Sequence, residues 1–396
     1  MKALEGIRIL DLTHMVSGPY ATLMLADSGA EIIKVEPSGR GENTRKLLSD
    51  DKNYSIDGMG AYFLTLARNK RSITLDLKEK KGMAIFHKLV KKADVVVYNF
   101  RSGEGEARGL SYERLKEVNK KIVCCSITGF GETGRHKDRV AFDLVAQGAG
   151  GGMFLCGGET PQRAGLPIGD LGAGLMACIG IQTALLARQK TLCGQQVDIS
   201  MQDCQISLLN YMATSYFLSG KMPQPARNQH FAFVPYGCYM ASDGYLIIAI
   251  VKDDAFKRLV DTLELKELSG SELESVKGRL EHREKINQAI DKKLASQKKE
   301  YWIDLLSKNN VPCGPVHSLK EAMEDLHLKD RNMIVKVPHP NGKKVSQVGN
   351  PIKLSDTYED TFLPPPLLGQ DNEDVYKGLL GFSLEEYSAL KKEGII

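Results

Sequence analysis

GIRILDLTHMVSGPYATLMLADSGAEIIKVEP, residues Gly6 to Pro37, is the stretch that decides the fold. Its first part, Gly6–Leu12, is a short apolar run typical of a strand. Helical spacing follows from Pro19 to Ala26 and stops at Gly29, and Glu31–Val35 reads as a second strand. Two strands joined by a helix within about 30 residues predict a βαβ unit.

The residues that follow repeat this alternation. Apolar strand-type runs occur at Ser72–Leu75, Val95–Tyr98 and Ile122–Ile127, with an amphipathic helix predicted over Lys80–Lys92. Near-continuous Val and Ile runs separated by helices are typical of parallel strands buried on both faces. The sequence therefore predicts an α/β protein with a Rossmann-like, doubly wound sheet in a large domain.

The middle of the chain predicts a second, smaller domain. Glycines at 148, 150–152, 157 and 158 precede a long helix, roughly Leu171–Arg188, and another apolar helix is expected from about Cys204 to Leu218. Lys221–Pro225 resembles a linker, and Asp243-Gly244 predicts a hairpin followed by lysine-rich helices. We expect a large domain over 1–220, a small α+β domain over 226–325, and a segment 330–396 that returns to the large domain and ends in an amphipathic helix.

Composition excludes several classes of protein. The 396 residues contain 53 Lys and Arg against 49 Asp and Glu, and a net charge of +4 does not indicate a nucleic-acid binder. We expect no transmembrane helix and no signal peptide, because neither a long apolar run nor a cleavable apolar start is evident. The eight cysteines are scattered without a CxxC pair, which favours a reduced, cytoplasmic protein.

Familiar catalytic motifs are missing. The first βα turn, Thr13–Pro19, does not spell GxGxxG, which argues against an NAD-dependent dehydrogenase. Walker A, GxSxG and metal-ligand spacings are also absent, so we expect no metal site. His14 follows a predicted strand, where it could contact a ligand or simply satisfy loop backbone.

Basic residues gather around two predicted strands: Arg68, Lys70, Arg71 and Lys78 around one, and Arg101 and Arg108 after another. Such a cluster could hold phosphates, although a solvated charged face is the more common outcome.

Asp170, within PIGDLGAG (167–174), is the most informative acidic residue. It stands before a long apolar helix, so it could be an N-cap, which the pattern alone favours. The same helix terminus could keep its carboxylate ionised in an apolar pocket, a setting that suits a nucleophile.

The chain resembles the class III coenzyme A transferases, also called the CaiB/BaiF family. The matching stretches, from residue 4 to about 370 and in family order, are LDLTH (10–14), GAEIIKVEP (29–37), RNKRSITLDLK (68–78), NFR (99–101), SITGFG (126–131), Gly169-Asp170, DGY (243–245) and PPPLLGQ (364–370). The resemblance implies transfer of coenzyme A (CoA) from an acyl-CoA to a carboxylic acid, with no tightly bound cofactor, in a homodimer of two ring-like chains that interlock.

The resemblance also implies roles for single residues. Asp170 matches the catalytic aspartate, and the residues that match CoA contacts are His14, Val16, Ser17, Leu75, Lys78, Asn99 and Phe100. Relatives usually have a basic residue at the position of Ala107, and here Arg108 follows one place later. We expect Arg108 to replace that contact after a small shift; the alternative is that this phosphate contact is lost. A glycine run found in the small domain of formyl-CoA transferase has no counterpart between 225 and 330.

A carboxylate nucleophile suits this reaction, because attack on a thioester gives a mixed anhydride and keeps the acyl group activated. The alternatives are a 2-methylacyl-CoA racemase of the same fold and a non-catalytic CoA-binding protein. Racemase relatives place a histidine immediately before the residue that matches Asp143, whereas this chain has Phe142, which cannot transfer a proton.

Overall fold

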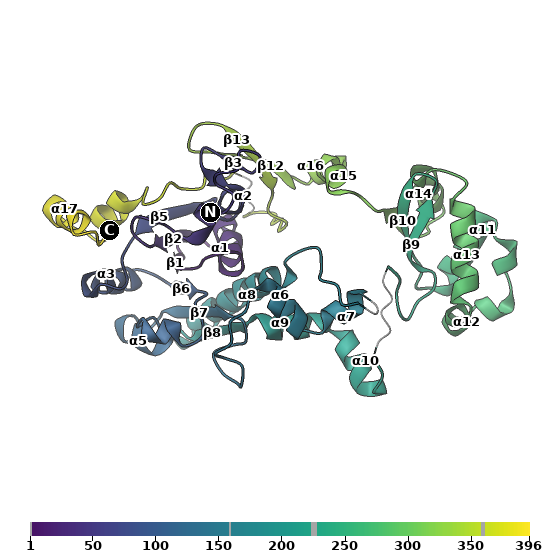
Figure 1. Ribbon diagram of the computed structural model, residues 1–396, viewed down its shortest axis with the longest axis horizontal. Coiled ribbons are helices and arrows are strands. Elements are labelled where there is room, and N and C mark those ends of the chain that lie inside the picture. The colour runs from purple at the N-terminus through teal and green to yellow at the C-terminus, as the bar shows by residue number, and fades with distance from the viewer. Residues whose placement is uncertain (1, 158–159, 223–227, 358–360) are drawn as a thin grey trace. The chain divides into compact units, whose positions relative to one another are not determined.

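The computed structural model describes residues 2–157, 160–222, 228–357 and 361–396. Gly158 of the glycine-rich stretch and Pro223–Pro225 of the expected linker lie outside the described residues. The chain divides into two compact units, drawn in Figure 1. Unit 1 comprises Met1–Gly151, Ala164–Asn210 and His327–Ile396, and unit 2 comprises Gly152–Arg163 and Tyr211–Leu326. The boundary at Asn210 precedes the residue 220 expected from the sequence, and a short piece before Asp170 groups with unit 2.

A parallel sheet of six strands forms the centre of unit 1. Its strands are β1 (Arg8–Asp11), β2 (Glu31–Glu36), β5 (Lys70–Thr74), β6 (Val95–Tyr98), β7 (Val123–Thr128) and β8 (Gln196–Ser200). They lie in the order β5-β2-β1-β6-β7-β8, and every pair is parallel. This is the 3-2-1-4-5-6 order of a Rossmann sheet, with the order reversing between β1 and β6. The predicted α/β class with a central parallel sheet is confirmed.

Helices cover both faces of this sheet, because alternate side chains of each strand point to opposite faces. Ile9, Val95 and Val123 pack on one face with α1 (Ser17–Asp27), α8 (Ile168–Thr191) and α9 (Met201–Leu209). Leu10, Val96 and Cys124 pack on the other with α3 (Lys80–Val90) and α5 (Tyr112–Val118). The sheet is therefore doubly wound, with one hydrophobic core on each side.

The remaining strands and α-helices of unit 1 are short. They are β3 (Ser55–Ile56), β4 (Met59–Gly60), α2 (Ala61–Leu66), α4 (Glu104–Ala107), α6 (Asp143–Ala149), β12 (Ile334–Pro338), β13 (Lys344–Val348) and α17 (Leu384–Lys392). The C-terminal segment joins the second core through Val375, Tyr376, Ile395 and Ile396. Asn372 also accepts the backbone N–H of Thr74, which ties this segment to strand β5.

Unit 2 has its own sheet and its own core. Strands β9 (Tyr236–Ala241), β10 (Gly244–Ala249) and β11 (Cys313–Pro315) form an antiparallel sheet, and the β9–β10 turn lies at the predicted Asp243-Gly244 hairpin. The α-helices of this unit are α7 (Gly152–Gly157), α10 (Tyr211–Ser219), α11 (Asp253–Leu263), α12 (Val276–Glu281), α13 (Arg283–Leu294), α14 (Lys299–Lys308) and α15 (Leu319–Glu324), and α16 (Leu326–Asp330) spans the boundary to unit 1. Leu246, Leu259 and Trp302 belong to the core of this unit.

Two helix predictions need correction. The single helix expected over Cys204–Leu218 is divided into α9 and α10 by Asn210, whose φ of 48° lies in the left-handed region that interrupts a right-handed helix. The long helix α8 begins at Ile168 rather than at Leu171, so Asp170 lies inside its first turn. By length and composition alone α8 could cross a membrane, but 44% of its apolar window is buried and it packs in the core of unit 1.

Candidate active site

The carboxyl ends of the sheet strands surround a cavity of about 140 Å³. Its walls include His14 after β1, Asn99 and Phe100 after β6, Gly129 after β7, and Asp170 from α8. It lies where the strand order reverses between β1 and β6, the usual ligand-binding place in open α/β sheets. A larger hollow at the opposite edge, lined by residues such as Lys92, Asp94 and Arg188, contains none of the predicted site residues.

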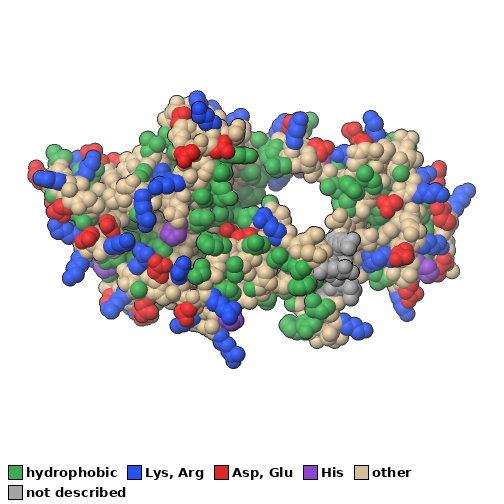
Figure 2. Space-filling view, viewed as in Figure 1, with side chains coloured by type: hydrophobic (Ala, Val, Ile, Leu, Met, Phe, Trp, Pro, Cys, Tyr) green, Lys and Arg blue, Asp and Glu red, His purple; other side chains and the backbone are tan. Residues whose placement is uncertain are grey.

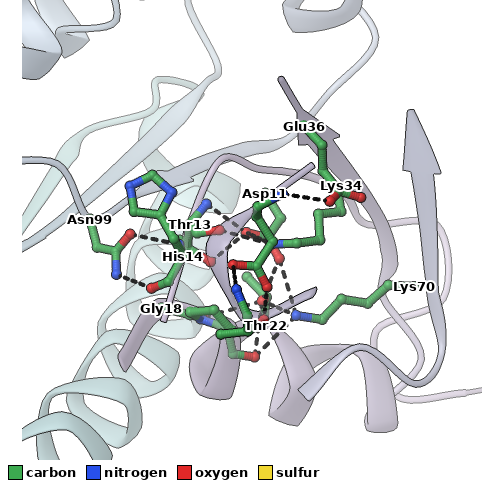
Figure 3. A network of polar contacts seen from close by, with 12 residues as sticks. Asp11, Thr13, His14, Gly18, Thr22, Lys34, Glu36, Lys70 and Asn99 are labelled. Carbon is green, nitrogen blue, oxygen red and sulfur yellow. Dashed lines mark hydrogen bonds and ion pairs between the residues drawn. The ribbon is translucent and has the colours of Figure 1, made fainter. Parts of the chain in front are cut away.

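A buried ionic network holds the first loop of this cavity. The carboxylate of Asp11, fully buried at the end of β1, accepts hydrogen bonds from the backbone N–H and hydroxyl of Thr13 and from Lys70 Nζ at 3.1 Å. Lys34 Nζ donates to the carbonyl of Thr13 at 2.8 Å (Figure 3). Burial alone would raise the pKa of Asp11, but Lys34, Lys70 and Thr13 outweigh burial and hold that pKa well below its ordinary value. The loop therefore begins from a fixed, charged anchor.

Asn99 fixes the next residue of the loop from a neighbouring strand. Its Oδ1 accepts the backbone N–H of His14 at 2.9 Å, and its Nδ2 donates to the carbonyl of His14 at 2.7 Å (Figure 3). The His14 ring lies 5.2 Å from the ring of Phe100. Burial, followed by the positive charge of Lys34, lowers the pKa of His14 to about 4. His14 is therefore a neutral imidazole at pH 7.

Asp170 is not the cap of α8. Pro167 occupies the N-cap position and supplies no side-chain hydrogen bond. The cap comes from α6 instead, because Asp143 Oδ1 accepts the backbone N–H of Gly169 at 2.8 Å and that of Asp170 at 3.3 Å. A Cβ on Gly169 would lie 2.9 Å from the carbonyl oxygen of Asp143, so glycine permits this close approach. The cap interpretation that the sequence pattern favoured is therefore wrong.

The carboxylate of Asp170 is left without a partner. Within the described ranges of the chain, it accepts no hydrogen bond and forms no ion pair. Burial, and then the negative charge of Asp143, raises the pKa of Asp170 from 3.8 to about 6. A carboxyl group with such a pKa in a cavity is a candidate for chemistry and ionises below neutral pH.

The other residues predicted to contact CoA differ in where they lie relative to the cavity. Ser17 lines the cavity with His14, Asn99 and Phe100. Arg108 lies outside the lining, where its guanidinium stacks 4.8 Å from the centre of the Phe100 ring and pairs with Glu104. Of the remaining three, Val16 is half-buried beside the lining residues, Leu75 is buried in the core, and Lys78 is exposed beyond β5.

Three residues of the basic cluster at 68–78 are paired with carboxylates and are not free to hold a phosphate. Arg68 is buried and pairs with Asp27 at 2.6 Å, while Lys70 pairs with Asp11. Arg71 is shared between Glu31 and Asp371. The phosphate interpretation and the solvated-face interpretation are thus both wrong for Arg68 and Lys70, which are buried counterions.

Sequence reasoning missed several residues of the site. Asp143, which caps α8, drew notice in the sequence only as the neighbour of Phe142. Gly129 lets the following loop approach β7, because a Cβ there would lie 2.4 Å from the Cβ of Ala141. That loop brings Arg139, Val140 and Phe142 to the cavity. In the described part of the chain, no group of three or more His, Cys, Asp and Glu is arranged to hold a metal ion.

Comparison with known proteins agrees with this geometry. The chain is 36% identical over 417 residues to formyl-CoA:oxalate CoA-transferase from Streptomyces avermitilis, covering all of both chains. It is 31% identical over 399 residues to human succinyl-CoA:glutarate CoA-transferase, covering all of this chain and 90% of the human one. A crystal structure of a CaiB/BaiF family protein from Brucella suis superposes with a TM-score of 0.83 at 33% identity, covering 96% of this chain and 99% of that one.

Residues 4–372 match the family described as CoA-transferase family III, which is most of the chain. Full-length matches to CoA-transferases from distant organisms agree with that assignment. The chain therefore belongs to CoA-transferase family III and is an enzyme of the CoA-transferase type.

Proposed function

We propose that this enzyme moves CoA from an acyl-CoA donor to a carboxylic acid through covalent intermediates on Asp170. The observation that carries the proposal is the unpartnered carboxylate of Asp170, which shares one cavity with His14, Asn99 and Phe100. A free carboxylate with a pKa of about 6 is ionised at pH 7 and keeps its nucleophilic lone pairs available.

The chemistry balances without another reactant. A carboxylate oxygen of Asp170 attacks the thioester carbonyl, the C–S bond breaks, and CoA leaves as a thiolate with a mixed anhydride on the enzyme. The thiolate then attacks the aspartyl carbonyl, which releases the donor acid and leaves an aspartyl-CoA thioester. The acceptor carboxylate attacks this thioester to form a second mixed anhydride, and the thiolate finally attacks the acceptor carbonyl. CoA is now on the acceptor, and the carboxylate of Asp170 is regenerated.

The racemase alternative is not favoured at this cavity. Phe142, which lines the cavity, has no group that exchanges a proton. A racemase needs both an acid and a base at the α-carbon. The full-length relatives named above are CoA-transferases.

Chemical trapping tests the proposal. Wild-type enzyme is incubated with succinyl-CoA and then with hydroxylamine, and the peptide containing Asp170 is examined by mass spectrometry. We expect a hydroxamate at Asp170 in the wild type and none in Asp170→Asn, which also loses turnover. Asp203→Asn is the matched control, because Asp203 occupies the same first-turn position in α9 and does not line the cavity. Turnover by Asp170→Asn, or hydroxamate only at other residues, would contradict the mechanism.

We also propose that two copies of the chain form an interlocked homodimer. The apolar side chains of Leu175, Ile179 and Leu186 on α8 are exposed, as are Phe217 and Leu218 on α10. Figure 2 shows a group of hydrophobic side chains on the surface of α10. Exposed apolar surface of this kind favours burial against a partner, and a second copy of the chain is the partner we propose. A monomer by light scattering at micromolar concentration would contradict it.

The cytoplasmic location, the absence of a nucleic-acid or membrane partner and the absence of a resident cofactor remain predictions. The steps above require only an acyl-CoA and a carboxylic acid. Cell fractionation tests the location, and mass spectrometry of the purified native protein tests for a bound cofactor.

A further inference from the structure

Two arginines, Arg101 and Arg139, line the active-site cavity. Arg139 lines the cavity together with Asp170, and its side chain makes no hydrogen bond or ion pair within the residues that the structure describes. Arg108, and more weakly Arg101, lower the pKa of the Glu104 carboxyl group, so Arg101 has an anionic neighbour. A cation in a cavity without a carboxylate partner is suited to bind an anionic ligand.

The loop that carries Arg139 is held against the sheet. Gly129, at the end of β7, allows Ala141 to lie so close that a Cβ on the glycine would be 2.4 Å from the Cβ of Ala141. The segment then continues into α6, whose first residue, Asp143, caps α8 through the N–H groups of Gly169 and Asp170. The loop that carries Arg139 is thus linked to the start of α8 by the hydrogen bonds of Asp143, and Arg139 and Asp170 line the same cavity.

The position of Arg139 favours the reacting end of a substrate. The acyl carbon must reach Asp170, whereas the phosphates of CoA are separated from that carbon by the whole pantetheine arm. A cavity of about 140 Å³ is too small to contain both ends of an acyl-CoA. A guanidinium that lines the same cavity as Asp170 is therefore available to the acid being exchanged.

We propose that Arg139 binds the second carboxylate of a dicarboxylic acid whose first carboxylate reacts at Asp170. This inference rests on the function proposed above and names the substrate class of the same site. Val140, Phe142 and Met201 give the cavity an apolar part, where an uncompensated carboxylate would be unfavourable. The planar guanidinium can donate two parallel hydrogen bonds to that carboxylate and neutralise its charge.

The decisive variant is Arg139→Gln, with Arg135→Gln as its control. Arg135 belongs to the same exposed loop but does not line the cavity. Transfer from succinyl-CoA is measured with succinate labelled with ¹³C and with butyrate, which have the same chain length but differ by one carboxylate. Because both acceptors use one donor, an effect of the substitution on the donor cancels in the ratio of the two kcat/KM values.

We expect wild type and Arg135→Gln to prefer succinate, and Arg139→Gln to lower the succinate-to-butyrate ratio about ten- to hundredfold. The affinity for free CoA, measured by calorimetry, should be unchanged in Arg139→Gln. An unchanged ratio would overturn the inference, and an unchanged ratio with weaker CoA binding would assign Arg139 to a phosphate. Preference of the wild type for butyrate would also overturn it. Absence of transfer to any acid by the wild type, together with absence of hydroxamate at Asp170, would instead refute the proposed function.

Discussion

Replacing Asp170 with asparagine is expected to abolish activity and to stabilise the protein at neutral pH. The side chain of asparagine has the shape of the uncharged acid, so it fits the same place without a buried charge. In the wild type, burial and the neighbouring Asp143 raise the pKa of Asp170 from 3.8 to about 6. An acid whose pKa is raised by folding favours the folded state when protonated, and this advantage is lost as the pH rises through the folded pKa. Above pH 6 the wild type therefore carries the full cost of ionising Asp170.

The size of this cost follows from the difference between the folded and unfolded pKa of Asp170. A tenfold change in an acid dissociation constant corresponds to about 1.4 kcal/mol, so ionised Asp170 lowers the free energy of unfolding by about 3 kcal/mol at most. We expect Asp170→Asn to unfold at a temperature a few degrees higher than the wild type at pH 7.5. The difference should fall to roughly half at pH 5 and nearly disappear at pH 4, where the wild-type acid becomes protonated.

Thermal unfolding of wild type, Asp170→Asn and Asp143→Ala at these three pH values tests the argument. Asp143→Ala should lower the free energy of unfolding by about 1 kcal/mol, because it removes the side chain that caps α8. If Asp170→Asn instead lowered the unfolding temperature at pH 7.5, Asp170 would be a structural residue. A gain that did not change between pH 7.5 and pH 4 would show that the pKa of Asp170 is not raised.

Three further predictions concern the groups around the cavity. Asp143→Asn removes a charge and keeps an oxygen that can accept the N–H of Gly169, so the acidic limb of the kcat/KM profile should move to lower pH. Lys78→Ala should weaken CoA binding several-fold, and more at low salt, by calorimetry, because an exposed cation attracts phosphates. Lys70→Met leaves Asp11 buried with one cation fewer, and it should lower the free energy of unfolding by about 3–5 kcal/mol in urea titrations.

Each of these has an outcome that would contradict it. An acidic limb that did not move in Asp143→Asn would mean that the charge of Asp143 does not reach Asp170. Equal CoA affinity in Lys78→Ala and in Lys80→Ala, a control with an exposed lysine two positions away, would remove Lys78 from the site. Lys70→Met with wild-type stability would show that Lys34 alone balances the buried Asp11.

The sheet could be predicted from the sequence because its signal is local. Runs such as Val95–Tyr98 are apolar at every position, and burial on both faces is the common reason for such runs. The order of the strands could not be predicted from local patterns, because pairings such as β1 with β6 join residues that are far apart in the chain. The break at Asn210 was missed for a related reason, since the apolar spacing continues through it and only the backbone angle of one residue interrupts the helix.

The burial of charged residues was still harder to predict, because it too depends on residues that are far apart in the chain. Arg68 and Lys70 look like surface cations in the sequence, because the carboxylates that pair with them come from distant parts of the chain. Arg68 pairs with a carboxylate of α1, and Lys70 pairs with one of β1. A long side chain with a charge at its end can be buried only where such a partner exists, and the partner is not visible in the local pattern. Family resemblance does not correct this, because matching residues indicate which positions matter and not which ion pairs they form.

Asp143 of α6 and Asp170 of α8 illustrate why the proposed nucleophile could not be identified from its local pattern. An acidic residue before an apolar helix normally accepts the free N–H groups of the first turn, and Asp170 has that position in the sequence. In the fold Asp143, which is 27 residues earlier, accepts those N–H groups from a different helix. A carboxylate that caps a helix has its lone pairs occupied by N–H groups, whereas one that is displaced from this role keeps its lone pairs free to react. Capping by Asp143 therefore stabilises the helix and leaves the carboxylate of Asp170 free to react. A search for a nucleophile of this kind should look for a second carboxylate that accepts the N–H groups of the first turn in its place.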